Sequence, residues 1–189
     1  MKKTLLALLV ASAAMTGPAL AADTYKIDPT HSHVGFRVSH LGFSNMVGRF
    51  DDVSGEFSFD ETDPAKSSVS VTVNADSVNT NMAERDNHLR SGDFLDTGNF
   101  PEASFRSTSI EVTGENSATI KGELTVLGKP VPITVDAVRT GGGQDPWGGV
   151  RQGFSGRASL SLKDLGVKTD LGPDSDAVEL VVELEGIRQ

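Results

Sequence analysis

The chain has 189 residues, no cysteine and a formal net charge of −9. Without cysteine it can form neither disulfides nor thiolate metal sites, so packing and backbone pairing must stabilise the fold. The strong negative charge argues against nucleic acid or an anionic membrane surface as a partner.

The first 21 residues have the pattern of a cleaved secretory signal peptide. Lys2 and Lys3 give a positive start, and the apolar run 5–14 is too short to span a bilayer. Ala19-Leu20-Ala21 has the small-x-small form of a cleavage site. We therefore expect residues 22–189 to form a single periplasmic domain that does not insert stably into a membrane.

From Tyr25 onward, apolar residues alternate with polar ones along most of the chain. This period of two is typical of antiparallel strands with one apolar face and one wet face. Charged residues such as Arg37, Glu123 and Glu183 fall at outward positions, which would face lipid in an outer-membrane barrel. The pattern therefore argues against a barrel of that kind. The segments that show the alternation are 34–38, 55–59, 69–73, 110–112, 120–126, 131–135, 158–162 and 178–184.

These segments predict an all-β fold, an eight-stranded antiparallel β-barrel. The predicted inward residues are mostly Val, Leu, Ile and Ala, and the chain has only nine Phe, one Trp and one Tyr. A solid core of this size usually contains more large aromatic side chains. The composition therefore favours a hollow barrel with apolar walls, suited to a hydrocarbon ligand.

The alternation changes phase at two places, and each change predicts a β-bulge. Phe50 is out of phase with Val53 and the residues that follow, which places one irregularity near 51–52. Phe105 is out of phase with Ile110, which places the other within 106–109. Bulges of this kind curve a sheet toward closure.

The segment 81–101 interrupts the strand pattern and predicts a short helix over about residues 82–91 near the mouth of the barrel. Asn81 and Glu84 have capping-box spacing, and Gly92 suits a helix end. Asp86 and Arg90 are spaced for a helical ion pair, whereas Arg85 or Arg90 could instead face an anionic ligand head. A single short turn of helix is also expected within 161–170, which contains Lys163-Asp-Leu-Gly166.

An enzymatic alternative rests on histidines and acids. His31 and His33 have an acceptable metal spacing on a strand, and His88 with Asp86 or Asp93 could act as a hydrolase acid/base pair. The more economical interpretation is that these groups form hydrogen bonds at the rim and on the helix surface. Neither a metal nor a cofactor is predicted.

Several sequence blocks are specific enough to indicate a family. They are Tyr25-Lys-Ile-Asp-Pro29, His31-Ser-His-Val-Gly-Phe36, His40-Leu-Gly-Phe43, Glu84 to Asp96, Phe100-Pro-Glu-Ala-Ser-Phe105, Asp145-Pro-Trp-Gly-Gly149 and Lys168-Thr-Asp-Leu-Gly-Pro173. With these blocks the chain resembles the YceI-like polyisoprenoid-binding family over nearly all of residues 22–189. The resemblance implies a lipocalin-like barrel that binds a polyisoprenoid or another long-chain amphiphilic lipid, with no established enzymatic activity.

The resemblance also implies a set of ligand-binding residues, to which the strand pattern adds two inward positions, Val38 and Phe57. Trp147 could be a lid residue or simply an anchor for its loop. A homodimer along an edge strand is a further alternative. The residues carried over from the family are His33, Phe36, His40, Phe43, Met46, Arg85, His88, Leu89, Phe94 and Trp147.

Overall fold

Antiparallel strands dominate the structure, a computed structural model that describes residues 22–189. The predicted signal peptide, 1–21, lies outside the described residues. The strands are β1 (Asp23–Ile27), β2 (His33–His40), β3 (Ser44–Phe50), β4 (Val53–Phe59), β5 (Ser68–Asn74), β6 (Val78–Asn79), β7 (Glu102–Val112), β8 (Ser117–Val126), β9 (Lys129–Gln144), β10 (Val150–Ser161) and β11 (Ala177–Arg188). The helical segments are α1 (Ala83–Arg90), α2 (Leu162–Leu165) and the 3-10 turns η1 (Pro64–Lys66), η2 (Ala75–Ser77) and η3 (Pro173–Ser175).

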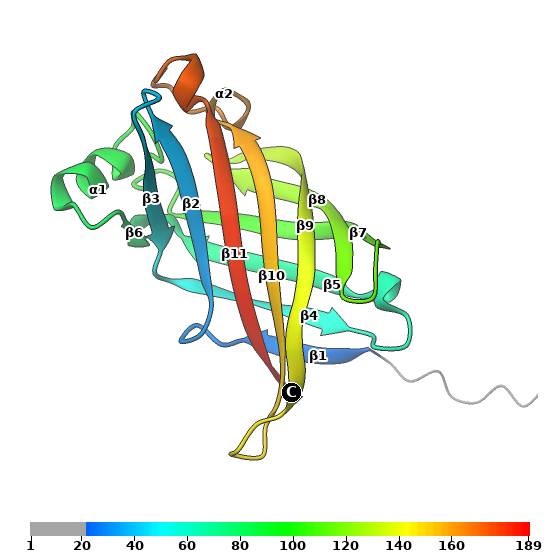
Figure 1. Ribbon diagram of the computed structural model, residues 1–189. Helices are drawn as coiled ribbons and strands as arrows, with labels where there is room; N and C mark the ends of the chain where they lie inside the picture. The colour runs from blue at the N-terminus through cyan, green and yellow to red at the C-terminus, as the bar shows by residue number, and fades with distance from the viewer. Residues whose placement is uncertain (1–21) are drawn as a thin grey trace, which may run out of the picture.

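The sheet closes into a barrel through the ring β1–β4–β5–β7–β8–β9–β10–β11, because β11 pairs again with β1 (Figure 1). Strand β11 pairs with β2 through 178–183 and with β1 through 186–188, so β1 and β2 lie end to end along the same neighbour. Strands β3 and β6 extend the sheet from β2. The closed ring confirms the predicted eight-stranded antiparallel barrel.

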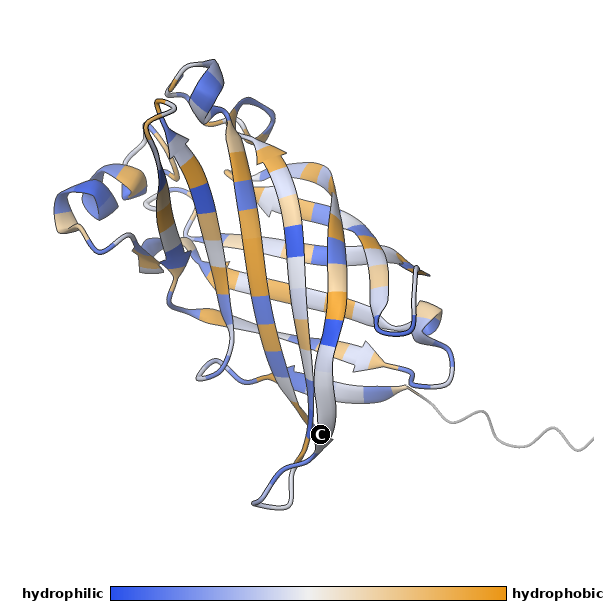
Figure 2. Cartoon of the chain, in the orientation of Figure 1, coloured by the Kyte–Doolittle hydropathy of each residue, from blue (hydrophilic) through white to orange (hydrophobic). Residues whose placement is uncertain are grey.

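Hydrophobic and hydrophilic residues alternate along many of the strands (Figure 2). This alternation decides which side chains face the interior. The cluster of buried apolar residues that forms the core joins β1, β2, β4, β5 and β11. There the rings of Tyr25 and Phe57 stack at a centroid distance of 5.0 Å, and Phe154 meets Phe57 edge-on at 5.3 Å. Burying these rings is favourable both for the apolar area removed from water and for the ring geometry.

Of the two predicted β-bulges, the one within 106–109 is confirmed, whereas the one near 51–52 is wrong, because the chain there ends one strand and begins the next. Asp51 and Asp52 separate β3 from β4, and their backbone N–H groups donate to the Ser77 carbonyl and hydroxyl oxygens. In β7 the pairing with β8 shifts between Ser107 and Ser109. The shift lets residues on both sides of it face the interior, which the phase change in the sequence required.

Helix α1 confirms the predicted helix, but its predicted capping box is wrong. Met82 precedes the first turn without a side-chain cap, and Asn81 has a φ of 62°. The Asp86 carboxylate instead accepts hydrogen bonds from the Thr80 N–H at 2.8 Å and the Thr80 hydroxyl at 2.5 Å. These bonds fix the turn that leads into the helix.

The predicted Asp86–Arg90 ion pair is also wrong. The Arg90 guanidinium donates to the backbone carbonyls of Asp76 at 2.7 Å and Val78 at 2.9 Å, and so ties α1 to η2 and β6. The second predicted turn is α2, which ends at Gly166 with a φ of 89°, a conformation that glycine adopts without strain.

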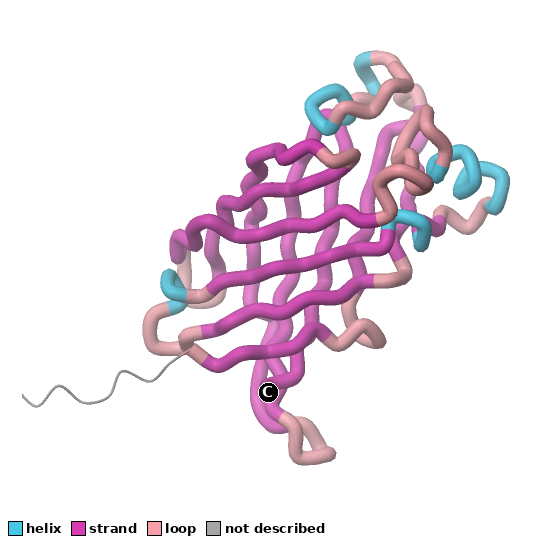
Figure 3. Tube along the Cα trace, turned by 180° about the vertical axis from the view of Figure 1, so that it is seen from behind, coloured by secondary structure: helices cyan, strands magenta, loops and turns pink. Residues whose placement is uncertain are grey.

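The barrel has two distinguishable ends (Figure 3). Helices α1 and α2 lie at one end, which we call the α1 end, and η1 with the β7–β8 turn (113–116) lies at the other, the η1 end. Within residues 22–189, no helix has the length and apolar character needed to cross a membrane.

Candidate ligand-binding site

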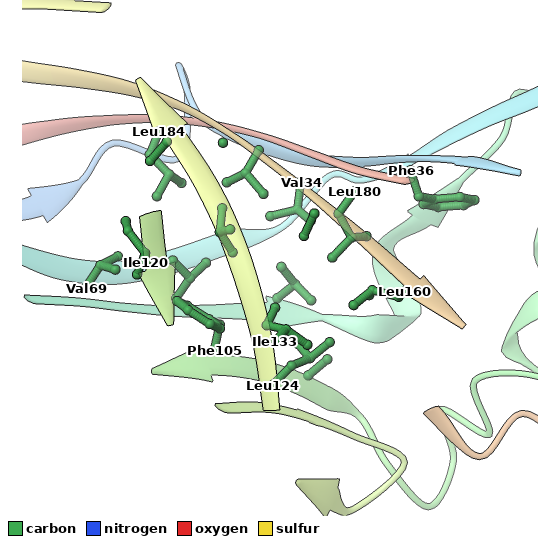
Figure 4. Close-up of a pocket in the computed structure, with 18 of the residues that line it drawn as sticks. Val34, Phe36, Val69, Phe105, Ile120, Leu124, Ile133, Leu160, Leu180 and Leu184 are labelled. Carbon is green, nitrogen blue, oxygen red and sulfur yellow. The ribbon is translucent and has the colours of Figure 1, made fainter. Parts of the chain in front are cut away.

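An apolar cavity of about 350 Å³ occupies the inside of the barrel, and Figure 4 shows part of its wall. All strands except β1 contribute to its lining. A volume of this size lies at the lower limit for small-molecule sites, which span about 300–1,000 Å³. The apolar wall residues from the strands are Val34, Phe36, Val38, Met46, Phe50, Phe57, Phe59, Val69, Val71, Val73, Val78, Ala103, Phe105, Ile110, Val112, Ala118, Ile120, Leu124, Val126, Ile133, Val135, Ala137, Phe154, Ala158, Leu160, Val178, Leu180, Val182 and Leu184.

At the α1 end, side chains from the helices and connecting segments complete the wall. The segment after α1 turns back on itself, with the Leu95 N–H donating to the Leu89 carbonyl at 2.9 Å. The residues lining this end from outside the strands are Leu89, Phe94, Leu95, Phe100, Leu127, Leu162, Leu165, Val167 and Leu171. This end of the cavity is therefore predominantly apolar.

Polar lining residues gather at the η1 end. The hydroxyls of Ser58 and Ser68 lie 2.8 Å apart there, and Arg139 projects beside the β7–β8 turn, with its backbone N–H bonded to the Asn116 carbonyl at 2.8 Å. The polar and charged lining residues of this end are Ser58, Ser67, Ser68, Glu115, Asn116, Ser117 and Arg139. Among the described lining residues, Arg139 is the one with a positive charge.

Six of the residues predicted from sequence line the cavity. The strand positions point inward because they share the phase of their apolar neighbours, and the two residues from the helical segment reach the cavity from the α1 end. They are Phe36, Val38, Met46, Phe57, Leu89 and Phe94.

His33, His40 and Phe43 do not line the cavity. His33 is in the opposite phase to Val34 and is exposed, and His40 is exposed at the last position of β2, next to the β2–β3 turn. Phe43 is in that turn, where it is 86% exposed.

Arg85, His88 and Trp147 also lie away from the cavity. The Arg85 guanidinium donates to the hydroxyl and the carbonyl of Thr80, both at 2.7 Å, so it reinforces the turn before α1. His88 packs edge-on against the Phe94 ring at 5.0 Å, on the outer side of this lining residue. Trp147 is 83% exposed in the β9–β10 hairpin.

The structure does not place the residues of the hydrolase hypothesis in a catalytic arrangement. His88 Nε2 lies 3.4 Å from an Asp93 carboxylate oxygen, and both side chains are more than half exposed. Asp86, the other proposed partner, is buried against Thr80. No histidine of the described chain lines the cavity.

The metal-ligand hypothesis pairs His31 with His33, but the cluster that the fold assembles contains Asp28, His31 and Glu185. Within residues 22–189, the Arg151 guanidinium already bridges this cluster, donating to Asp28 at 2.8 Å and to Glu185. Its Nε also donates to Asp145 at 2.8 Å. An arginine cation therefore compensates these carboxylates, and the network ties the β1–β2 turn to β10 and β11.

Hydrogen bonding perturbs the titration of this network. The Thr30 hydroxyl, Arg151 and His31 donate to the Asp28 carboxylate and hold its pKa well below its ordinary value of 3.8, although burial opposes the shift. The Asp145 pKa is lowered in the same direction, chiefly by its bond from Arg151. The three carboxylates raise the pKa of the Arg151 guanidinium.

Comparison with known proteins agrees with the fold and the apolar cavity. The model of the YceI-like domain matches residues 25–186. A UPF0312 protein of Pseudomonas paraeruginosa is 54% identical over 192 residues, covering all of both chains. The crystal structure of BcnA from Burkholderia cenocepacia superposes with a TM-score of 0.76 at 23% identity, covering 84% of this chain and 98% of BcnA.

A polyisoprenoid-binding domain from Saccharophagus degradans superposes with a TM-score of 0.66 at 17% identity, covering 87% of this chain and 98% of that domain. At these identities the two structures demonstrate the fold alone. The family match spans most of the described chain, and the full-length relative shares more than half of its residues. On these grounds the chain belongs to the YceI-like family.

Proposed function

We propose that this protein binds a polyisoprenoid or a similar long-chain amphiphilic lipid in its barrel and sequesters or carries that lipid in the periplasm. The observation that supports it best is the cavity itself, whose wall is predominantly apolar outside the η1 end. A hydrocarbon chain placed there leaves water without leaving polar groups unpaired.

Burial of the ligand's hydrocarbon tail supplies most of the binding affinity. Each methylene that moves from water into the cavity contributes about 0.8 kcal/mol, so a few isoprene units offset the cost of immobilising the ligand. A predominantly apolar cavity that is lined from one end of the barrel to the other suits a flexible hydrocarbon tail better than a compact polar metabolite.

Two further observations support the proposal. The Saccharophagus degradans domain with the same fold is described as polyisoprenoid-binding. The sequence of residues 1–21 has the pattern of an export signal, which supports a periplasmic location.

Extraction of the native ligand tests this function. The protein is expressed with its own first 21 residues, purified from the periplasm without detergent, extracted with organic solvent and analysed by mass spectrometry. We expect a prenyl-chain lipid in stoichiometric amount. Recovery of protein that carries no lipid, and that takes up none when farnesol is added, would contradict the proposal.

A further inference from the structure

Beyond the apolar tunnel, the cavity has a polar end, and we propose that Arg139 there binds the anionic oxygen head group, a phosphate or carboxylate, of the amphiphile. The inference rests on the proposed lipid binding and adds the chemistry and orientation of the ligand. Its head lies at the η1 end, and its tail runs toward Leu171 and Phe94 at the α1 end.

The position of Arg139 in β9 explains why it points inward. Ile133, Val135 and Ala137 line the cavity at every second position of this strand, and Arg139 is the next residue in the same phase. Its register partner in β10 is Phe154, which also lines the cavity. An arginine on the inward face of an apolar strand is costly to place unless its charge has a use or a partner.

The guanidinium is held in a defined orientation. Its Nε donates to the Gln152 side-chain oxygen at 2.9 Å, and Gln152 is only 6% exposed. The Cζ atom lies 5.3 Å from the centroid of the Phe59 ring, within cation–π range. A guanidinium fixed in this way loses little freedom when it binds an oxyanion.

The present counter-ion of Arg139 is exchangeable. Nη2 lies 3.3 Å from a carboxylate oxygen of Glu61, whose side chain is 73% exposed, whereas the Arg139 side chain is 27% exposed. An ion pair with one partner this exposed contributes little stability. Nη1 has no hydrogen-bond partner among residues 22–189. A ligand oxyanion can therefore replace Glu61 and use both terminal nitrogens.

The surroundings supply further hydrogen-bond donors at the same end. Ser58, Ser67, Ser68, Asn116 and Ser117 line the cavity there, and hydroxyl and amide groups donate to phosphate or carboxylate oxygens. Glu115 also lines this end, but it is exposed in the β7–β8 turn, where solvent screens its charge.

The arginines predicted from sequence are not available for this role. Arg85 is bonded to Thr80, and Arg90 is bonded to the carbonyls of Asp76 and Val78. Neither lines the cavity. The positive charge that lines the cavity is thus at the opposite end of the barrel from α1.

Two ligands with the same chain isolate the head group: farnesyl monophosphate and farnesol, each titrated by calorimetry at fixed ionic strength. We expect Arg139→Gln to lower the affinity for farnesyl monophosphate about tenfold, equivalent to about 1.4 kcal/mol of binding free energy. The affinity for farnesol should stay within about twofold of the wild-type value. Glu61→Gln frees the guanidinium and is expected to strengthen farnesyl monophosphate by about threefold, again without changing farnesol.

Arg157→Gln is the matched control, because Arg157 is 66% exposed, bonds Glu179 on the outer face and carries the same charge. It is expected to change neither affinity. Arg139→Lys keeps the charge without the planar fork and provides a second variant if Arg139→Gln fails to fold; an intermediate loss of phosphate affinity is expected, and thermal melting checks the fold of each variant.

The outcomes separate this inference from the proposed function. If farnesol binds but the Arg139 variants affect both ligands equally, or if Glu61→Gln weakens both, the Arg139–Glu61 pair is a structural latch and the head-group site is wrong. If neither ligand binds the wild-type protein, the lipid-binding function itself fails.

Discussion

At the scale of single residues, the side chain that faces the lumen at each strand position controls whether a ligand fits. Ala137 in β9 lines the cavity and is 8% exposed, whereas the next residue, Val138, faces outward and is 48% exposed. The two positions share a strand and differ only in the face on which they lie.

This pair gives a prediction about cavity volume. Ala137→Trp should fill part of the lumen and lower the affinity for farnesol by at least about tenfold. The overpacking should also lower the free energy of unfolding by about 1–3 kcal/mol. Val138→Trp adds the same ring outside and should leave farnesol affinity within about twofold. Calorimetric titration measures the affinities, and urea denaturation measures stability. Equal effects of the two substitutions would show that the ligand does not occupy the lumen.

The buried carboxylate of Asp28 gives a prediction about pH. Folding lowers the pKa of the Asp28 carboxyl, so its ionised form stabilises the protein at a pH above the pKa that Asp28 has in the unfolded state. This contribution is lost as the pH falls toward the pKa that Asp28 has in the folded state. Between about pH 5 and pH 2, the unfolding free energy of the wild type should therefore fall more steeply than that of Asp28→Asn.

Urea denaturation across this pH range measures the free energy of unfolding of each variant. Asp23→Asn serves as the control, since Asp23 is a half-exposed carboxylate paired with Arg188 on the surface. Its pH dependence should follow that of the wild type. Parallel curves for the wild type and Asp28→Asn would mean that the Arg151 network does not set acid stability.

At the scale of elements, much of the architecture follows from local rules. Strands could be predicted because an apolar residue at every second position suits a sheet with one buried face. The phase change within 106–109 located the bulge in β7, whereas the one near 51–52 marks the break between β3 and β4. The capping of α1 could not be predicted, because Asn81 adopts a positive φ and Thr80 supplies the bonds to Asp86. That choice depends on how the chain leaves β6.

The candidate site was predictable to the same extent. Inward strand positions such as Phe36 and Val38 follow from phase, whereas the fold of the segments 91–101 and 162–171 over the α1 end depends on tertiary contacts. Exposed Phe43 and Trp147 show that an aromatic residue in a turn gives no sign of which way it faces. Arg139 was missed, although its phase with Ile133, Val135 and Ala137 marks it as inward.

The bulge in β7 gives a prediction at this scale. Deleting Thr108, which lies between the two paired residues Ser107 and Ser109, should keep Phe105 and Ile110 on the inner face and cost only about 1–2 kcal/mol. Deleting Lys121 from the regular strand β8 should turn one half of that strand inside out, so that the barrel does not fold. Far-ultraviolet circular dichroism and thermal melting compare the two. Equal tolerance of both deletions would show that the bulge does not set the facing.

At the scale of the whole molecule, the closed ring leaves each barrel strand paired on both sides and places a continuous apolar surface inside. The interior is lined by aliphatic residues together with eight of the nine phenylalanines, and a lumen of about 350 Å³ remains between them. Polar groups concentrate at the η1 end, and apolar segments cover the α1 end. The difference between the polar η1 end and the apolar α1 end matches the head group and the tail of an amphiphile.

The most direct test of this account is a crystal structure of the protein expressed with its own first 21 residues and purified without detergent. We predict continuous elongated electron density inside the barrel, in contact with Leu180, Phe105 and Ile133 and ending near Arg139. A barrel whose opposite walls close against each other, with no space along its axis, would contradict the account.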